Sequence, residues 1–182
     1  MRKGVEALLF QLLEHELGGV RVYEAALRCA RLPALREQWQ KFLDQTLDHV
    51  DIARGLVDAL GLDPDLEHPA RPSVRATIDA LVARMQAALA GDPVLAQVVA
   101  AESVMQAEAV DQLNWEVMGE IAQRIQGDLG VTLRQAHQLV AAQEADQLDQ
   151  TVAWVRALWS EAIGLPLHTT VTPGGFAPTQ GR

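Results

Sequence analysis

Three glutamates and one histidine occupy positions where a helical core normally carries leucine. Glu16, His49, Glu102 and Glu144 each lie in a run of apolar residues spaced three and four apart. That spacing keeps each run on one face of a helix. Ionised carboxylates are rarely buried unless they are paired or bound to metal. Several of them directed into one core predict a shared cation, and carboxylate oxygens with an imidazole nitrogen suit iron or manganese.

The elements that carry these residues are predicted to be four long helices, at about residues 3–29, 33–60, 92–125 and 132–163. Gly61 is expected to end the second helix, Asp92 with Pro93 to start the third, and Thr132 to cap the fourth. The predicted turns are residues 31–33 and the segment Gly127–Gly130. Two short turns give two antiparallel hairpins, and the long connection at 61–92 carries its own helix at about 73–89. We expect an all-α four-helix bundle with one long crossover.

The composition of the chain limits the classes of function that the protein can have. The 182 residues suit one domain, predicted at 1–163, followed by an irregular C-terminal tail at 164–182. A net charge of −9 disfavours nucleic acid and anionic membranes as partners. The single cysteine, Cys29, excludes an intrachain disulfide, and no apolar run or leader pattern indicates a membrane span or secretion. The expected location is the cytoplasm.

The order of the polar residues resembles that of the ferritin-like superfamily, of the bacterioferritin and rubrerythrin type. The series is Glu16, then Thr46-x-x-His49, then Glu102, then Glu144-x-x-Gln147, with Tyr23 two turns after Glu16. The resemblance covers about residues 3–163. It implies an up-down-down-up bundle that holds one or two iron or manganese ions and reacts with dioxygen or peroxide. It also implies that Tyr23 is a hydrogen-bond or radical partner outside the ligand set.

Two residues depart from that pattern. Thr46 stands where the family has a bridging glutamate, and Gln147 where it has a second histidine, so a full two-metal centre lacks a bridge and a nitrogen ligand. Glu16, His49 and Glu144 remain. Glu102 is the first candidate to complete the set from its seam position, but Glu108, or Asp111 beyond it, lies closer in level to Glu144 if the helices run straight.

Two functional hypotheses follow from this ligand set. In the first, the protein is a ferritin-like metal-binding protein with redox activity. In the second, the site no longer binds metal, and the bundle serves as a structural or interaction module in which Thr46 and Gln147 are traces of the loss. The apolar face of the crossover helix either covers the bundle or forms a homodimer contact.

Overall fold

The chain folds into five α-helices. The computed structural model describes residues 2–165, and the helices are α1 (Arg2–Cys29), α2 (Pro33–Ala59), α3 (Arg71–Ala88), α4 (Pro93–Ala122) and α5 (Gly127–Ile163). Within that range there is no β-strand, so the predicted all-α class is confirmed. Most of the predicted C-terminal tail, residues 166–182, lies outside the described residues. None of the described helices is long and apolar enough to cross a membrane.

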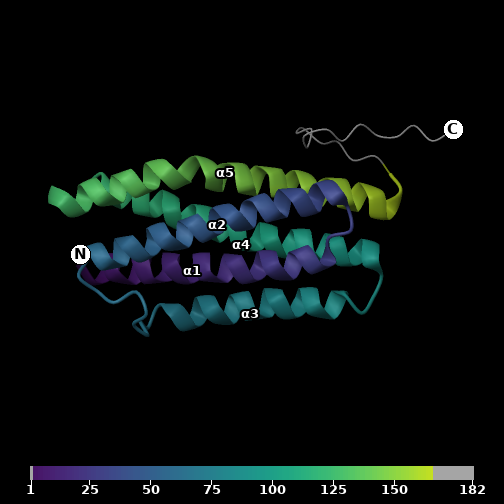
Figure 1. The fold of residues 1–182 in the computed structure, drawn as a ribbon, viewed down its shortest axis with the longest axis horizontal. Helices are drawn as coiled ribbons and strands as arrows, with labels where there is room; N and C mark the ends of the chain where they lie inside the picture. The colour runs from purple at the N-terminus through teal and green to yellow at the C-terminus, as the bar shows by residue number, and fades with distance from the viewer. Residues whose placement is uncertain (1, 166–182) are drawn as a thin grey trace.

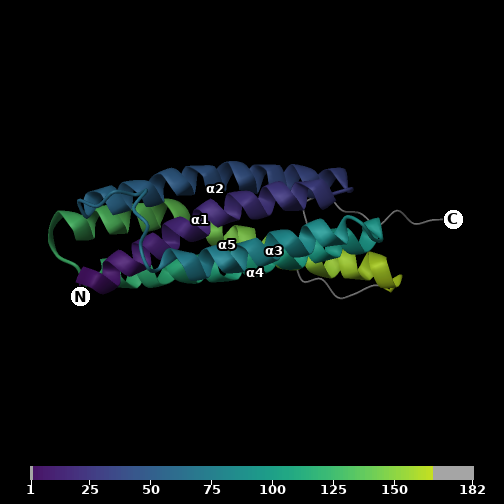
Figure 2. The ribbon, with the colours of Figure 1, turned by 90° about the horizontal axis from the view of Figure 1, so that it is seen from below.

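The helices lie alongside one another in an elongated arrangement. Figure 1 shows α1 and α5 running in one direction and α2 and α4 in the other, with short connections inside the pairs α1–α2 and α4–α5. The long connection between α2 and α4 contains a helix, α3, which runs along α1 and α4 (Figure 2). The apolar residues of α3 are buried there: Val74, Ile78, Leu81 and Met85. The apolar face of α3 therefore packs on α1 and α4, which is the first of the two alternatives predicted for it.

Local signals explain most helix ends. The Asp92 carboxylate accepts from the backbone N–H groups of Val94 and Leu95, so Asp92 caps α4 as predicted. Gly61 has φ 74°, the left-handed conformation expected just past the end of α2. The predicted start of the last helix was wrong, because α5 begins at Gly127 and Thr132 already lies inside it. Gly130 is not a turn residue; a Cβ there would lie 2.0 Å from the carbonyl oxygen of Ile125.

Two apolar clusters fill the interior, and a polar layer separates them along every long helix. In α1 the first cluster ends at Leu13 and the second begins at Val22. In α5 the corresponding residues are Val140 and Trp154. The segments between the clusters carry the buried polar residues Glu14, His15, Glu16, Thr46, His49, Glu108, Asp111, Asn114, Glu144, Gln147 and Thr151. The two apolar clusters therefore stabilise the fold, whereas the polar layer between them consists of groups that are costly to bury.

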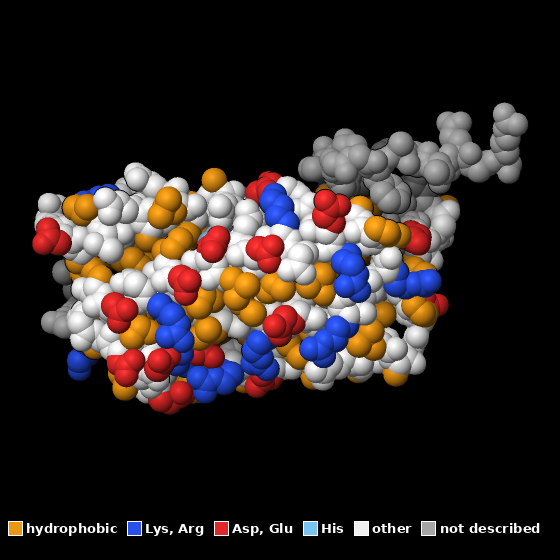
Figure 3. All heavy atoms as spheres, in the orientation of Figure 1, with side chains coloured by type: hydrophobic (Ala, Val, Ile, Leu, Met, Phe, Trp, Pro, Cys, Tyr) orange, Lys and Arg blue, Asp and Glu red, His pale blue; other side chains and the backbone are white. Residues whose placement is uncertain are grey.

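Ion pairs fix α3 over the polar layer. Arg71 donates to Glu14 at 2.8 Å, and both side chains are buried. Figure 3 shows acidic and basic side chains interspersed over α3, where exposed pairs such as Arg21–Asp79 lie. Ile78 packs against the backbone at Gly18, where a Cβ would come within 2.5 Å of its Cγ1. Gly18 therefore permits a close approach of α3 two residues after Glu16.

Candidate metal centre

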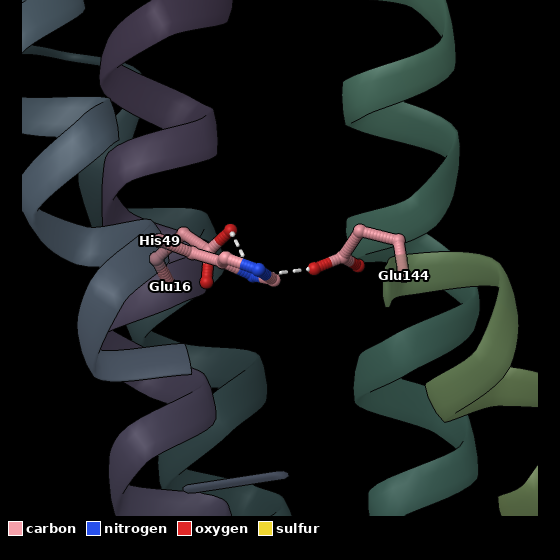
Figure 4. A group of neighbouring side chains, drawn as sticks. All are labelled: Glu16, His49 and Glu144. Atoms are coloured by element: carbon pink, nitrogen blue, oxygen red, sulfur yellow. Dashed lines mark ion pairs between the residues drawn. The ribbon is translucent and has the colours of Figure 1, made fainter. Parts of the chain in front are cut away.

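Glu16 of α1, His49 of α2 and Glu144 of α5 meet in the polar layer. Their exposed fractions are 0%, 1% and 1%, so water does not reach them from outside. One ligand atom from each residue lies within 4.8 Å of the other two. Figure 4 shows Glu16 beside His49, with the imidazole directed across the layer at Glu144. The structure therefore brings together three candidates that lie on three separate helices.

His49 makes polar contacts through both ring nitrogens. Nε2 lies 2.7 Å from the amide oxygen of Gln143, which is a hydrogen-bond acceptor. Nδ1 lies 2.8 Å from Oε1 of Glu144 and 3.6 Å from Oε1 of Glu16. Despite the short distance, no partner among the described residues gives Nδ1 a hydrogen bond of acceptable geometry. Nδ1 and these carboxylate oxygens therefore require a proton or another cation between them.

The Glu16 carboxylate is held by a tryptophan. The indole N–H of Trp115 donates to Oε1 of Glu16 at 2.6 Å, and neither side chain has exposed surface. Oε2 of Glu16 is buried and has no hydrogen-bond partner within residues 2–165. Burial raises the pKa of Glu16 well above its ordinary value and the charge of Glu144 raises it further, while the indole hydrogen bond opposes the shift. Glu16 therefore favours a bound proton or another cation more than an exposed carboxyl does.

Helix α4 adds two buried acids, Glu108 and Asp111, one turn apart. Burial, followed by the charge of Glu144, raises the pKa of Glu108 to about 8. The pKa of Asp111 is raised well above its ordinary value by burial and then by the charges of Glu16, Glu144 and Glu108. Neither acid forms an ion pair with a lysine or arginine in the described part of the chain. Within the layer, the charges of Glu16, Glu108, Asp111 and Glu144 therefore act on one another.

Tyr23, the predicted radical or hydrogen-bond partner, is fully buried beside these acids. Burial and then the charge of Glu108 raise the pKa of its phenol well above the ordinary value. Its hydroxyl forms no well-aligned hydrogen bond among the residues described. Tyr23 therefore belongs to the polar layer, on the side of Glu108.

The two positions that depart from the family pattern are both hydrogen-bonded elsewhere. The Thr46 hydroxyl donates to the carbonyl of Phe42 in its own helix. The Gln147 amide donates to Gln45 at 3.2 Å, leaving its buried oxygen without a partner in the described range. Gln147 thus retains one oxygen that faces the layer, whereas the Thr46 proton is used within α2.

The structure places Glu102 outside this group. Its carboxylate accepts from Arg84 of α3 and from the indole of Trp159 in α5, and its side chain is 25% exposed. The predicted seam of α4 was wrong, since Leu95 and Leu113 from the same run are 47% and 54% exposed. α4 is alanine-rich and packs against three helices, so its apolar residues do not mark one face. The buried face instead runs through Glu108, Asp111, Trp115 and Met118.

Sequence reasoning does not identify Gln143 or Trp115 as part of the site, and it offers Asp111 only as an alternative beyond Glu108. In the structure Gln143 contacts Nε2 of His49, and Trp115 donates to Glu16. The signal available for two of them is the helical spacing of Glu108, Asp111 and Trp115, which are three and four residues apart. Gln143 precedes Glu144 in the chain and carries no such signal.

Comparisons with protein-family models, with curated proteins and with solved structures give no match to this chain. The geometry itself defines an all-helical protein of five helices whose described residues include a buried Glu/His/Glu group with the donor atoms to hold a metal ion.

Proposed function

We propose that this protein binds a divalent iron or manganese ion in its core through Glu16, His49 and Glu144. The observation that carries the proposal is the pairing of His49 Nδ1 with two buried carboxylates. Nδ1 lies 2.8 and 3.6 Å from oxygens of Glu144 and Glu16, while Nε2 already contacts Gln143. An ion coordinated by Nδ1 and both carboxylates would take the place of a proton between them and balance the buried negative charge.

The donor set favours this class of ion. Two carboxylates and one imidazole are borderline to hard ligands, and such ligands suit iron and manganese better than the soft thiolates of cysteine do. Such an ion supplies one-electron redox chemistry toward dioxygen or peroxide. The protein's own part is to hold the ligands, exclude bulk water and keep protons on the surrounding acids.

The arrangement of helices supports a ferritin-like bundle. Helices α1, α2, α4 and α5 each contribute to the polar layer, and α3 forms the crossover between the two hairpins. Glu108 and Asp111 supply ligand oxygens for a second ion on the α4 side. The proposal therefore includes either one or two ions.

A metal-free bundle is the second candidate function, and it has its own supporting observation. Thr46 is hydrogen-bonded within α2 and Gln147 is hydrogen-bonded to Gln45. In that case a proton shared by Nδ1 of His49 and Oε1 of Glu144 would replace the ion, and the layer would be a hydrogen-bonded structural feature. The protein would then act as a structural or interaction module through its surface.

Metal analysis of untagged protein separates the two functions. We expect near-stoichiometric iron or manganese in the parent, or uptake after anaerobic incubation with iron(II) or manganese(II). The variants Glu16→Gln and His49→Ala should lose it because each removes a ligand. His15→Ala is the matched control, since His15 is also a buried histidine of the layer but lies outside the Glu/His/Glu group.

The two outcomes have different meanings. A parent that binds neither ion under anaerobic loading contradicts the metal function and leaves the structural module. Binding that survives in both ligand variants would show that the ion lies elsewhere, and would contradict the assignment of Glu16 and His49.

A further inference from the structure

The buried imidazole of His49 contacts two consecutive residues of α5. Its Nε2 lies 2.7 Å from the amide oxygen of Gln143, and its Nδ1 lies 2.8 Å from Oε1 of Glu144. The two ring nitrogens of an imidazole point in different directions, so contacts at both nitrogens fix how the ring is turned. One short segment of α5 therefore determines the orientation of a histidine that belongs to α2.

Packing alone does not determine which way the imidazole faces. A half-turn of the ring exchanges Nδ1 with Cδ2 and Nε2 with Cε1, and the outline of the ring stays almost the same. The Trp115 ring, whose centroid lies 6.3 Å from that of the imidazole, can pack against either orientation. After a half-turn, however, a carbon atom would face the Gln143 oxygen, and the hydrogen bond there would be lost. The polar contact with Gln143 thus selects the orientation in which Nδ1 faces the carboxylates.

Gln143 can select this orientation before an ion is bound. Its amide oxygen has only lone pairs, so it accepts from Nε2–H whether or not Nδ1 also carries a proton. The Glu144 carboxylate, in contrast, attracts Nδ1 only through a proton or another cation between them. A ligand that is already aligned in the metal-free protein needs no rearrangement when the ion binds, and the ion is therefore bound more tightly.

We propose that Gln143 is a positioning residue, which holds His49 so that Nδ1 faces Glu144 and Glu16 and can bind a divalent ion. The inference rests on the proposed function, because it requires an ion at Nδ1. Histidine ligands of metal sites commonly donate through their second ring nitrogen to a nearby acceptor, and removal of that acceptor weakens metal binding. Gln143 supplies such an acceptor. It is half-buried and belongs to neither apolar cluster, so a substitution there leaves both clusters intact.

Three substitutions on α5 separate the hydrogen bond from the bulk of the side chain. Gln143→Leu removes the acceptor, whereas Gln143→Glu keeps an acceptor oxygen on a side chain of the same length. Gln150→Leu is the matched control, because Gln150 is also a half-buried glutamine of α5, but its amide donates to Asp146 in the same helix. Only Gln143→Leu removes a hydrogen bond to the candidate ligand His49.

The first measurement is the affinity for manganese(II), taken from the electron paramagnetic resonance signal of the free ion. We expect Gln143→Leu to bind manganese(II) about 10- to 100-fold more weakly than the parent, because the imidazole is no longer held in the binding orientation. Gln143→Glu should bind at least as tightly as the parent, and Gln150→Leu should match the parent. Equal affinities of the parent and Gln143→Leu would overturn the inference while leaving the proposed function intact. Equal weakening in Gln143→Glu and Gln143→Leu would overturn it as well.

The second measurement identifies the ring nitrogen that binds the ion. With nitrogen-15-labelled histidine and zinc(II) as a diamagnetic probe, nuclear magnetic resonance should show a proton on Nε2 of His49 and the ion at Nδ1. The opposite arrangement, with zinc(II) at Nε2 and the proton on Nδ1, would overturn the inference, and this result needs only the parent protein if Gln143→Leu does not fold. A parent that binds none of manganese(II), iron(II) and zinc(II) would overturn the proposed function, and the inference with it.

Discussion

Replacing Glu108 with glutamine should make the metal-free protein increasingly more stable than the parent as the pH rises. Glu108 is buried in the polar layer, where burial and the charge of Glu144 raise its pKa from 4.5 to about 8. Between these two values the folded state holds a proton that the unfolded state has released. The folded state therefore loses stability as the pH rises through this window. Glutamine keeps the size of the side chain and carries no charge.

The magnitude follows from the pKa shift. One pKa unit corresponds to about 1.4 kcal/mol, so the shift of Glu108 makes a difference of up to about 5 kcal/mol across the window. The advantage of Glu108→Gln over the parent should grow by roughly 1 kcal/mol for each pH unit from about pH 5 to about pH 8. Below about pH 4 the carboxyl is protonated in both states, and the two proteins should differ little.

Urea unfolding in the presence of a chelator, repeated across this pH range, measures the difference. Glu120→Gln is the control, because Glu120 lies on the same helix but is exposed, so its charge stays in water in both states. A difference between Glu108→Gln and the parent that stays constant with pH would refute the reasoning. The reasoning would also be refuted if Glu108→Gln and Glu120→Gln changed the free energy of unfolding by the same amount at every pH.

Three further outcomes are expected. Manganese(II) should raise the melting temperature more at about pH 8 than at about pH 5, because at low pH the ion must displace protons from the buried acids. Equal increases in melting temperature at the two pH values, measured by calorimetry, would contradict this. Gly18→Ala should lower the free energy of unfolding by about 1–3 kcal/mol, because its Cβ would clash with Ile78. Gly55→Ala is the control, because no atom lies within 4 Å of its added Cβ, and it should raise that free energy by up to about 1 kcal/mol. Equal effects of the two substitutions in chemical unfolding would contradict the close packing at Gly18. Arg71→Leu should cost about 1–3 kcal/mol, because it removes the buried partner of Glu14 while Arg75 still pairs with that carboxylate at 3.0 Å. Adding Glu14→Leu should recover part of the loss, and a double variant with the summed cost would contradict the coupling.

The helical architecture could be predicted because its signals are local. Asp92 before Pro93 and Gly61 after α2 act through backbone hydrogen bonds and φ angles that do not depend on the rest of the fold. The start of α5 was missed because Gly127 and Gly130 look alike in sequence. Only the folded chain shows that Gly127 has a positive φ, whereas Gly130 is needed for close contact with the carbonyl of Ile125.

The candidate site was predictable where one helix face was clear. Glu16, His49 and Glu144 lie in runs that begin and end with large apolar residues, so their inward direction could be inferred from the spacing. On α4 that inference placed Glu102 inward, because alanine occupies so many positions that a face rotated by one residue fits equally well. The partners of Glu102 are Arg84 on α3 and Trp159 on α5, so the residue spacing within α4 cannot predict these contacts.

The polar layer is the feature that folding alone does not explain. Replacing buried charged groups by apolar residues of similar size is often neutral or stabilising by about 1–4 kcal/mol. Such replacements at Glu16, Glu108, Asp111 and Glu144 would also join the two apolar clusters into one continuous core. A chain that needed only a stable bundle would gain from that change, yet all four acids are present, and the pKa of Glu16, Glu108 and Asp111 is raised in the metal-free fold. A cation in place of the protons would recover that cost, and this is our reason for proposing a metal-binding protein rather than a structural module.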